Sequence, residues 1–227
     1  MTKTLTVAEM ALREIGRRRA VLVLLALLPL GFYLSRRDEA YWQSIRFVCL
    51  GIGWTLSTAA LFAGNGARGI EPRLRLSGYA TRQLVLGRLI ALWTLGLALS
   101  VPYWLLIRLD LNHVRYGAIA LILLLTTAVS APFGLALSTL LPRELEGMLV
   151  LLTVVAMQMM LDPDGTAAHA LPFWFSREIG TYAVNQVGAG YLLRGLLHAA
   201  IVLTALLTAL SLSAGIRLRR RAHLSLG

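Results

Sequence analysis

The sequence is poor in the residue types that build disulfide-stabilised domains and metal centres. Cys49 is the only cysteine, so no intrachain disulfide can form. It lies inside an apolar run, where a packed and inert thiol is expected. The four histidines are scattered along the chain, and none has the spacing of a metal site. Acidic residues are also scarce, 11 against 22 cationic residues, and Lys3 is the only lysine.

The sequence also lacks the motifs of nucleotide-binding and hydrolytic proteins. It contains no G-x-x-x-x-G-K-[ST] phosphate loop and no H-E-x-x-H zinc motif. It contains no G-x-S-x-G nucleophile elbow either. The paired acids Asp162 and Asp164 fall in a polar loop, where solvated charges are expected. Nothing therefore points to catalysis by this chain alone, and we assign it no catalytic residue, metal ligand or cofactor.

What the sequence has in excess is apolar residues. They make up 57% of the 227 residues, and mean hydropathy is +0.70, whereas soluble domains are roughly 45–50% apolar. The excess is gathered in blocks, which indicates membrane spans. The formal net charge of +11 would also suit a nucleic-acid-binding protein. Here the cations sit mostly at the ends of apolar runs, as in membrane proteins.

The apolar blocks predict a single-domain, all-α membrane protein with six transmembrane helices. The predicted spans are residues 20–34, 47–64, 85–107, 116–141, 148–161 and 191–216. Pro132 should kink or break the fourth span. With the N-terminus placed inside, roughly two thirds of the cations lie on the inner side, including those of the basic tail, residues 217–227. The chain is therefore expected in the cytoplasmic membrane, with both termini on the cytoplasmic side.

Two segments outside the spans have a helical character of their own. Residues 4–19 alternate apolar and charged side chains, which predicts an amphipathic helix lying in the headgroup layer, with Thr6 and Glu9 as a capping box. The alternative is a cytoplasmic extension of the first span. Residues 162–190 carry apolar and aromatic blocks, which predict a helical hairpin that dips into the outer leaflet and returns. The alternative is an ordinary exposed loop.

Few ionisable groups lie within the predicted spans. Arg88 is near enough to the inner end of the third span to snorkel. Arg194 and His198, four residues apart in the sixth span, share one helix face. With Gln158 and Ser57 they are candidates for a substrate path, although a snorkelling arginine, an interfacial histidine and helix-to-helix hydrogen bonds explain them as well. No carboxylate lies in mid-span, which disfavours an ion-coupled transporter.

The stretch between the second and third spans, residues 66–84, is polar and basic. It contains Glu71, then the leucine-rich run 73–77, then Thr81-Arg82, and Gly87-Arg88 follows at the start of the third span. These residues occur in this order in a chain that has an amphipathic helix before six spans. In both respects the chain resembles the membrane subunits of type-2 ABC transporters, which are mostly exporters. That family has an acid, a leucine-rich stretch, a Pro-Ser-basic step and a Gly-Lys here. This chain departs in having Gly78-Tyr79 where proline is usual and in being a few residues short.

Two further segments carry the resemblance over nearly the whole chain. The run from Gly134 to Arg143 is similar to the family's small-residue exit from the fourth span, followed by a polar turn. The block 171–174, Leu-Pro-Phe-Trp, is similar to the family's re-entrant region before the last span.

The resemblance implies an ATP-driven exporter in which this chain is one of two permease copies, or pairs with a paralogue. Two ABC ATPase subunits, which bind ATP and Mg, would dock underneath; membrane lipid is the other partner, and no nucleic acid is expected. The substrate class would be amphipathic: a drug, lipid, peptide or glycolipid. The expected coupling residues are Glu71, Arg73, Leu74, Arg75, Leu76, Ser77, Thr81 and Arg82, with Thr81 as the N-cap of the helix that follows.

Two other functions remain open at this point. The methionines at positions 157, 159 and 160 would suit a haem- or metal-handling permease of the same family. Alternatively, the chain is a membrane anchor or sensor that binds an ATPase and transports nothing. A flux assay separates the anchor from a permease.

Overall fold

The computed structural model describes residues 2–17, 19–37, 41–141, 143–162 and 165–217. Within these ranges the chain is helical and has no strand, which confirms the predicted all-α class. The helices are α1 (Lys3–Arg17), α2 (Arg19–Arg36), α3 (Tyr41–Ala67), α4 (Glu71–Leu76), α5 (Thr81–Asp110), α6 (Tyr116–Leu140), α7 (Glu144–Met160), the 3-10 helix η1 (Ala168–Ala170), α8 (Trp174–Val184) and α9 (Ala189–Arg217).

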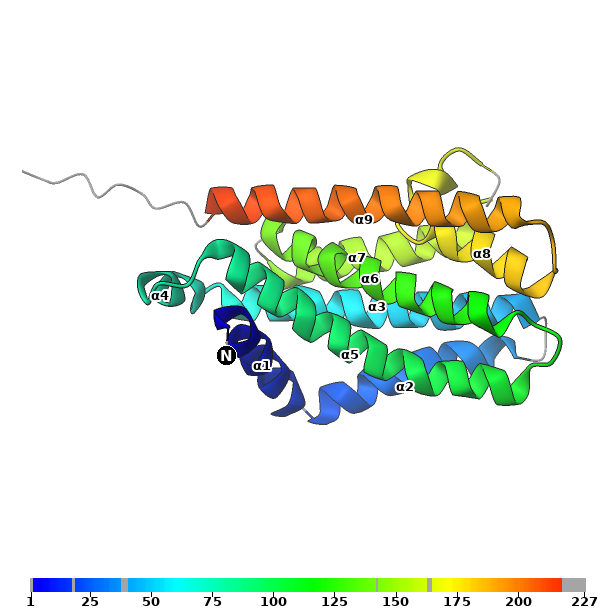
Figure 1. Cartoon of the computed structure of the whole chain (residues 1–227), viewed down its shortest axis with the longest axis horizontal. Helices are drawn as coiled ribbons and strands as arrows, with labels where there is room; N and C mark the ends of the chain where they lie inside the picture. Colours follow the sequence, from blue (N-terminus) through cyan, green and yellow to red (C-terminus); the bar gives the residue numbers. More distant parts are fainter. Residues whose placement is uncertain (1, 18, 38–40, 142, 163–164, 218–227) are drawn as a thin grey trace, which may run out of the picture.

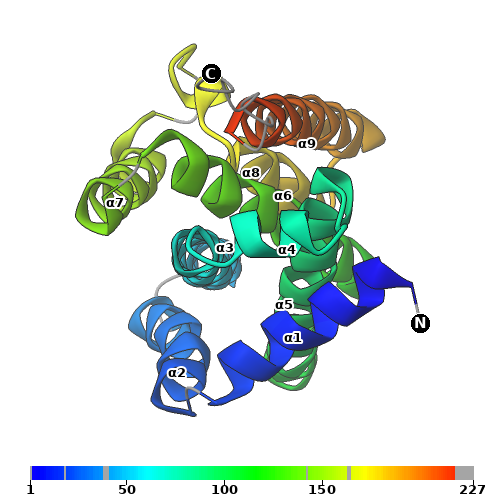
Figure 2. The ribbon, with the colours of Figure 1, turned by 90° about the vertical axis from the view of Figure 1, so that its left-hand side faces the viewer.

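The long helices form one bundle in which the chain reverses direction from each helix to the next. Figure 1 shows α2, α3, α5, α6, α7 and α9 running along the bundle, with α1 slanting across α5. The short α4 lies beyond one end, which we call the α4 end, and α8 lies beside α9 at the other, the α8 end. The start of α1 and the end of α9 both lie at the α4 end. Figure 2 looks at that end, where α1 crosses in front of α5 and α4 lies beside the end of α3.

In the described part of the chain, four helices are long and apolar enough to cross a membrane. They are Gln43–Ala67 of α3, Thr81–Asp110, Tyr116–Leu140 and Ala189–Ile216 of α9. Two helices that meet at 76°, Lys3–Arg17 and Leu22–Arg36, add a fifth if they are counted as one bent span. The chain is thus a multi-pass membrane protein.

The other two predicted spans coincide with shorter helices. α2 covers the expected residues 20–34, and α7 covers 148–160 of the expected 148–161. The 17 residues of α7 have a length of about 26 Å, short of a hydrocarbon core of about 30 Å. That α2 and α7 each cross the membrane therefore stays a prediction.

The N-terminal helix forms as predicted but is anchored differently. α1 begins at Lys3, and the backbone N–H of Thr6 donates to the carbonyl of Thr2. Thr6 is therefore inside the first turn, and the predicted capping box is wrong. Val7 and Ala8 are buried, and α1 packs on α5. An amphipathic stripe of this kind is satisfied equally by a neighbouring helix and by lipid.

Two details of the predicted spans are corrected. α6 runs unbroken from Tyr116 to Leu140 through Pro132, so the proline marks no break. In the described part of residues 162–190, the structure has the short η1 and then a single α-helix, α8, rather than a hairpin of two helices. Pro172 stands just before α8, and proline is compatible with a helix start but not with a helix interior.

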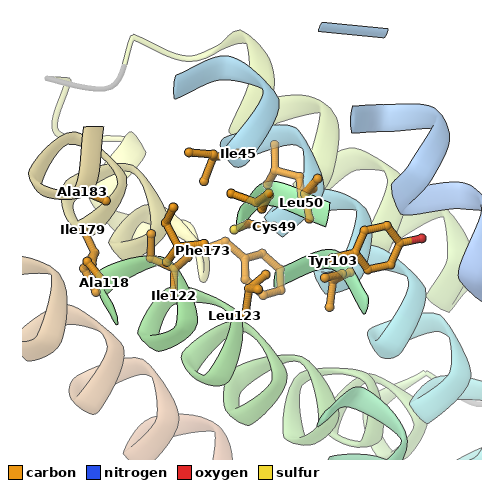
Figure 3. Packing of buried hydrophobic residues seen from close by; sticks show 14 of the residues in the cluster. Ile45, Cys49, Leu50, Tyr103, Ala118, Ile122, Leu123, Phe173, Ile179 and Ala183 are labelled. Carbon is orange, nitrogen blue, oxygen red and sulfur yellow. The ribbon is translucent and has the colours of Figure 1, made fainter. Parts of the chain in front are cut away.

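The largest core cluster lies toward the α8 end, where α3, α5, α6 and α8 meet. Phe173, just before α8, and Phe175, in its first turn, are almost completely buried there. Figure 3 shows Phe173 among Cys49, Ile122 and Leu123. The Cys49 thiol is buried, as predicted. Burial of α8 in this core fixes the position of its polar face.

Helices α3 and α6 approach each other most closely at small residues. A Cβ on Gly134 would lie 2.0 Å from the Ser57 carbonyl oxygen, and a Cβ on Gly64 would lie 2.1 Å from Ser138 Oγ. Only glycine allows backbones to approach this closely. The α3–α6 pair is therefore the tightly packed centre of the bundle.

Candidate functional site

The candidate site is the α4 end, where the basic stretch between α3 and α5 folds into a short helix. Gly78 ends α4 with a φ of +82°, a left-handed conformation that glycine adopts without strain. The N–H of Gly78 donates to the Arg75 carbonyl, and the N–H of Tyr79 to the Leu74 carbonyl, both at 3.1 Å. This is the Schellman arrangement for closing a helix. The stretch is therefore a defined structural element.

The base of α4 is fixed by an ion pair buried inside the protein. An Arg88 guanidinium nitrogen donates to Glu71 Oε1, with Glu71 only 1% exposed and Arg88 8%. The sequence placed Glu71 among the coupling residues and Arg88 at a snorkelling position; the structure instead pairs the two with each other and buries both. Each charge is the partner that makes burial of the other possible.

A second contact joins the approach to α4 with the end of α6. The guanidinium of Arg68 donates to the carbonyl of Ser138 and, at 3.1 Å, to that of Leu141. Carbonyls at a helix C-terminus lack intrahelical partners, so a guanidinium there satisfies them. Arg68 thus ties the α3–α4 link to α6.

Helix α1 clamps the α4–α5 turn from the other side. A Cβ on Gly87 would lie 2.7 Å from Val7 Cβ and 2.8 Å from the Thr4 carbonyl oxygen, so α1 lies directly on the α5 backbone. At the start of α1, Lys3 Nζ donates to the Gly78 carbonyl at 2.9 Å and lies 5.4 Å from the centre of the Tyr79 ring. Three separate elements, α1, α5 and α6, therefore hold the α4 region.

The predicted coupling residues divide into an exposed group and a packed group. Arg73, Leu76, Ser77 and Arg82 are exposed, and Leu76 is 87% exposed. An almost fully exposed leucine beside two arginines, at the tip of the molecule, is a combination suited to docking a protein partner.

The remaining coupling residues have structural contacts. Leu74 and Arg75 are half-buried, and Arg75 Nη1 donates to the Tyr79 carbonyl at 3.5 Å. Thr81 is the first residue of α5 rather than its N-cap. The cap position is occupied by Ala80, whose N–H donates to Gln83 Oε1 at 2.9 Å. Gln83 thus does the capping that was expected of Thr81.

The predicted substrate-path residues do not converge on one site. Ser57 is buried and its Oγ donates to the Ser130 carbonyl at 3.2 Å, a contact between α3 and α6. Gln158 is buried toward the α8 end, where Arg46 donates to its backbone carbonyl. For Ser57 the structure matches the alternative of a helix-to-helix hydrogen bond.

Arg194 and His198 do lie together, near the start of α9. Arg194 Nε is 2.9 Å from Glu178 Oε2 of α8. His198 Nε2 is 3.0 Å from the His169 carbonyl, and its ring lies 5.1 Å from that of Trp174. These contacts hold α9 against the segment before it.

A hollow of about 520 Å³ lies on the side of the bundle enclosed by α1, α2 and α3. Its walls are mostly apolar, and Glu14 and Arg88 contribute charge. The indole N–H of Trp54 and the hydroxyl of Thr55, both in residues that line it, are buried with no hydrogen-bond partner among the described residues. A hollow that combines apolar walls with a few polar groups suits an amphipathic ligand.

Sequence reasoning missed two features of these sites. One is the Glu71–Arg88 pair, although an arginine within a span is itself a signal for an acidic partner. The other is Glu178, buried in α8. Compared with known proteins, the chain matches no protein-family model and no curated protein. Its function is therefore argued from this geometry.

Proposed function

We propose that the chain is the membrane-embedded permease subunit of an ATP-driven exporter of the ABC type. Two copies, or one copy and a paralogue, pair in the cytoplasmic membrane, and two ATPase subunits that bind ATP and Mg dock at the α4 end. The observation that carries the proposal is α4 itself. Its base is held by α1, α5 and α6, while its tip presents Arg73 and an 87% exposed Leu76.

The anchoring of α4 supports a mechanical role. Displacement of α4 is resisted by the buried ion pair between Glu71 and Arg88 and by the Arg68 contacts with the end of α6. A force applied to the tip therefore reaches α5 and α6 without first bending a loose loop. ATP-driven movement of the partner would then shift the permease between inward-open and outward-open states.

The topology of the proposal follows from the arrangement of the bundle. With α2, α3, α5, α6, α7 and α9 as the six spans, both ends of the described chain lie on one side (Figure 1). The α4 end carries most of the cations, which makes it the cytoplasmic side by the positive-inside rule. The ATPase would then meet α4 where ATP is available.

The hollow beside α1, α2 and α3 supports an amphipathic substrate. At about 520 Å³ it falls in the range of about 300–1,000 Å³ typical of ligand sites. The methionines that suggested metal or haem handling, Met157, Met159 and Met160, are exposed and do not line this hollow.

The test is co-purification with an ATPase in mild detergent, using two matched variants. R73E/L76D alters the tip of α4. R108E/L109D makes the same changes at the α8 end, where Arg108 is exposed and Leu109, like Leu76, is 87% exposed. Loss of a cation and an apolar anchor from an interface should weaken association at least about tenfold.

We expect R73E/L76D to lose the ATPase and R108E/L109D to keep it, with both variants unfolding at the wild-type temperature. The captured protein must hydrolyse ATP, and substrate flux in vesicles must fall with R73E/L76D; an anchor would lose the ATPase without any flux to lose. If both variants retain the ATPase equally, α4 is not its docking site.

A further inference from the structure

A second hollow, of about 360 Å³, lies at the α8 end between α8 and α9. Figure 1 shows these two helices side by side there. Its lining is polar and aromatic: His169, Trp174, Arg177, Glu178, Thr181, Tyr191 and Arg194. It is far from α4 and shares no lining residue with the hollow beside α1, so the proposed function does not explain it.

The charges around this hollow are mainly positive. Glu178 is 3% exposed, and its carboxylate lies 2.9 Å from Arg194 Nε and 3.8 Å from Arg177 Nη1. Arg46 lines a small adjoining cavity together with Arg177 and Trp174. Two guanidinium groups thus flank one carboxylate in the hollow, and a third lies at the adjoining cavity. The excess positive charge makes the hollow a poor site for a cation and a good one for an anion.

The contacts of Arg194 leave its two terminal guanidinium nitrogens able to bind a ligand. It contacts Glu178 through Nε, and its guanidinium lies 4.5 Å from the centre of the Tyr191 ring. Its terminal nitrogens, which form the bidentate fork of arginine, have no partner among the described residues. The side chain is 58% exposed. Glu178 therefore holds one edge of a guanidinium that belongs to a lining residue of the hollow, and the fork is not used by that contact.

We infer that this hollow binds a phosphate-bearing anionic group, such as glycerol phosphate or the headgroup of an anionic phospholipid. Two guanidinium groups around one opening match the several acceptor oxygens of a phosphate better than a single carboxylate. A volume of about 360 Å³ leaves room for the glycerol portion. Trp174 and Tyr191 offer apolar surface for that portion and are typical of the membrane interface.

The phosphate has two possible sources, a membrane lipid and a soluble phosphate compound. The chain purified in detergent is titrated with short-chain phosphatidylglycerol, and bound lipid is counted by native mass spectrometry, with phosphatidylcholine for comparison. In a second arm, binding of glycerol phosphate is measured by calorimetry. Both arms use wild type, Arg194→Gln and Arg108→Gln; the control removes an exposed arginine at the same end that does not line the hollow.

We expect Arg194→Gln to weaken binding about tenfold or more, the effect of losing a charge-assisted hydrogen-bond pair, and Arg108→Gln to leave it unchanged. Arg194→Lys, which keeps a cation beside Glu178 but loses the fork, should also bind more weakly while unfolding at the wild-type temperature. Selective binding of phosphatidylglycerol identifies a lipid site, and binding of glycerol phosphate alone identifies a soluble ligand; both support the inference.

The inference is overturned if wild type binds neither probe more tightly than phosphatidylcholine. It is also overturned if Arg194→Gln and Arg108→Gln bind the probes equally well. Its failure is distinguishable from that of the proposed function, because co-purification of an ATPase depends on residues at the opposite end of the bundle.

Discussion

Replacing the Glu71–Arg88 pair by apolar residues, singly and together, should reveal a large coupling between the two positions. The single variants are Glu71→Leu and Arg88→Met, and the third variant carries both. Because Glu71 is 1% exposed and Arg88 8%, each single substitution breaks a buried ion pair by removing one of its two charges. Such a loss typically lowers the free energy of unfolding by about 3–5 kcal/mol.

The double variant should be far less destabilised than the sum of the two single variants. Removing both charges also removes the penalty of burying them, and apolar replacements of buried pairs are often close to neutral. The interaction energy of the cycle is therefore expected to be at least about 3 kcal/mol. The departure of this energy from zero is the informative quantity, since two independent sites would show additive losses and an interaction energy of zero.

The assay is reversible unfolding in mixed micelles of increasing dodecyl sulfate content, followed by circular dichroism. A second measurement reports whether α4 stays in place. It follows the rate at which a thiol-reactive probe labels Ser77→Cys in a Cys49→Ala background. Additive losses in the cycle, or single variants as stable as wild type, would show that the pair does not anchor α4.

Substitutions at three glycines, with a fourth glycine as a control, test other contacts; the first three variants use the same unfolding assay and the last uses proteolysis. Gly134→Ala should destabilise by about 2 kcal/mol or more because its Cβ would overlap the α3 backbone; Gly117→Ala in the same helix has nothing within 4 Å and should be neutral or stabilising by about 0.5–1 kcal/mol. Gly78→Ala should cost about 1–2 kcal/mol from its φ of +82°, and no cost would mean that the turn is not closed as described. Gly87→Val should push Val7, and α1 with it, away from α5, seen as faster proteolysis within α1; unchanged cleavage would contradict the clamp.

The positions of the helices were predictable because long apolar runs have few alternatives in a membrane. The predicted ends were less accurate. The third span was predicted from residue 85, with Thr81 as the N-cap of the helix that continues into it, whereas α5 includes Thr81 and has Ala80 as its cap. The cap formed by Gln83 depends on the side chain reaching back to Ala80.

The candidate site was located correctly in the chain but not in its contacts. The composition of residues 66–84 marks an unusual polar element, whereas the pairing of Glu71 with a residue 17 positions away depends on how α4 turns back onto α5. Local periodicity contains no information about that turn. The cluster around Glu178 was missed for the same reason, because it joins two helices and a neighbouring segment.

Helix α1 contacts both the α4–α5 turn and the hollow of about 520 Å³. Its first half grips the turn beside α4 through Lys3 and Val7, and its second half supplies Ala11 and Ile15 to the wall of the larger hollow. Because α1 is one continuous helix, a tilt of its first half also moves its second half. We therefore expect the mouth of that hollow to widen or narrow whenever the tip is pushed, with no rearrangement of the α3–α6 centre.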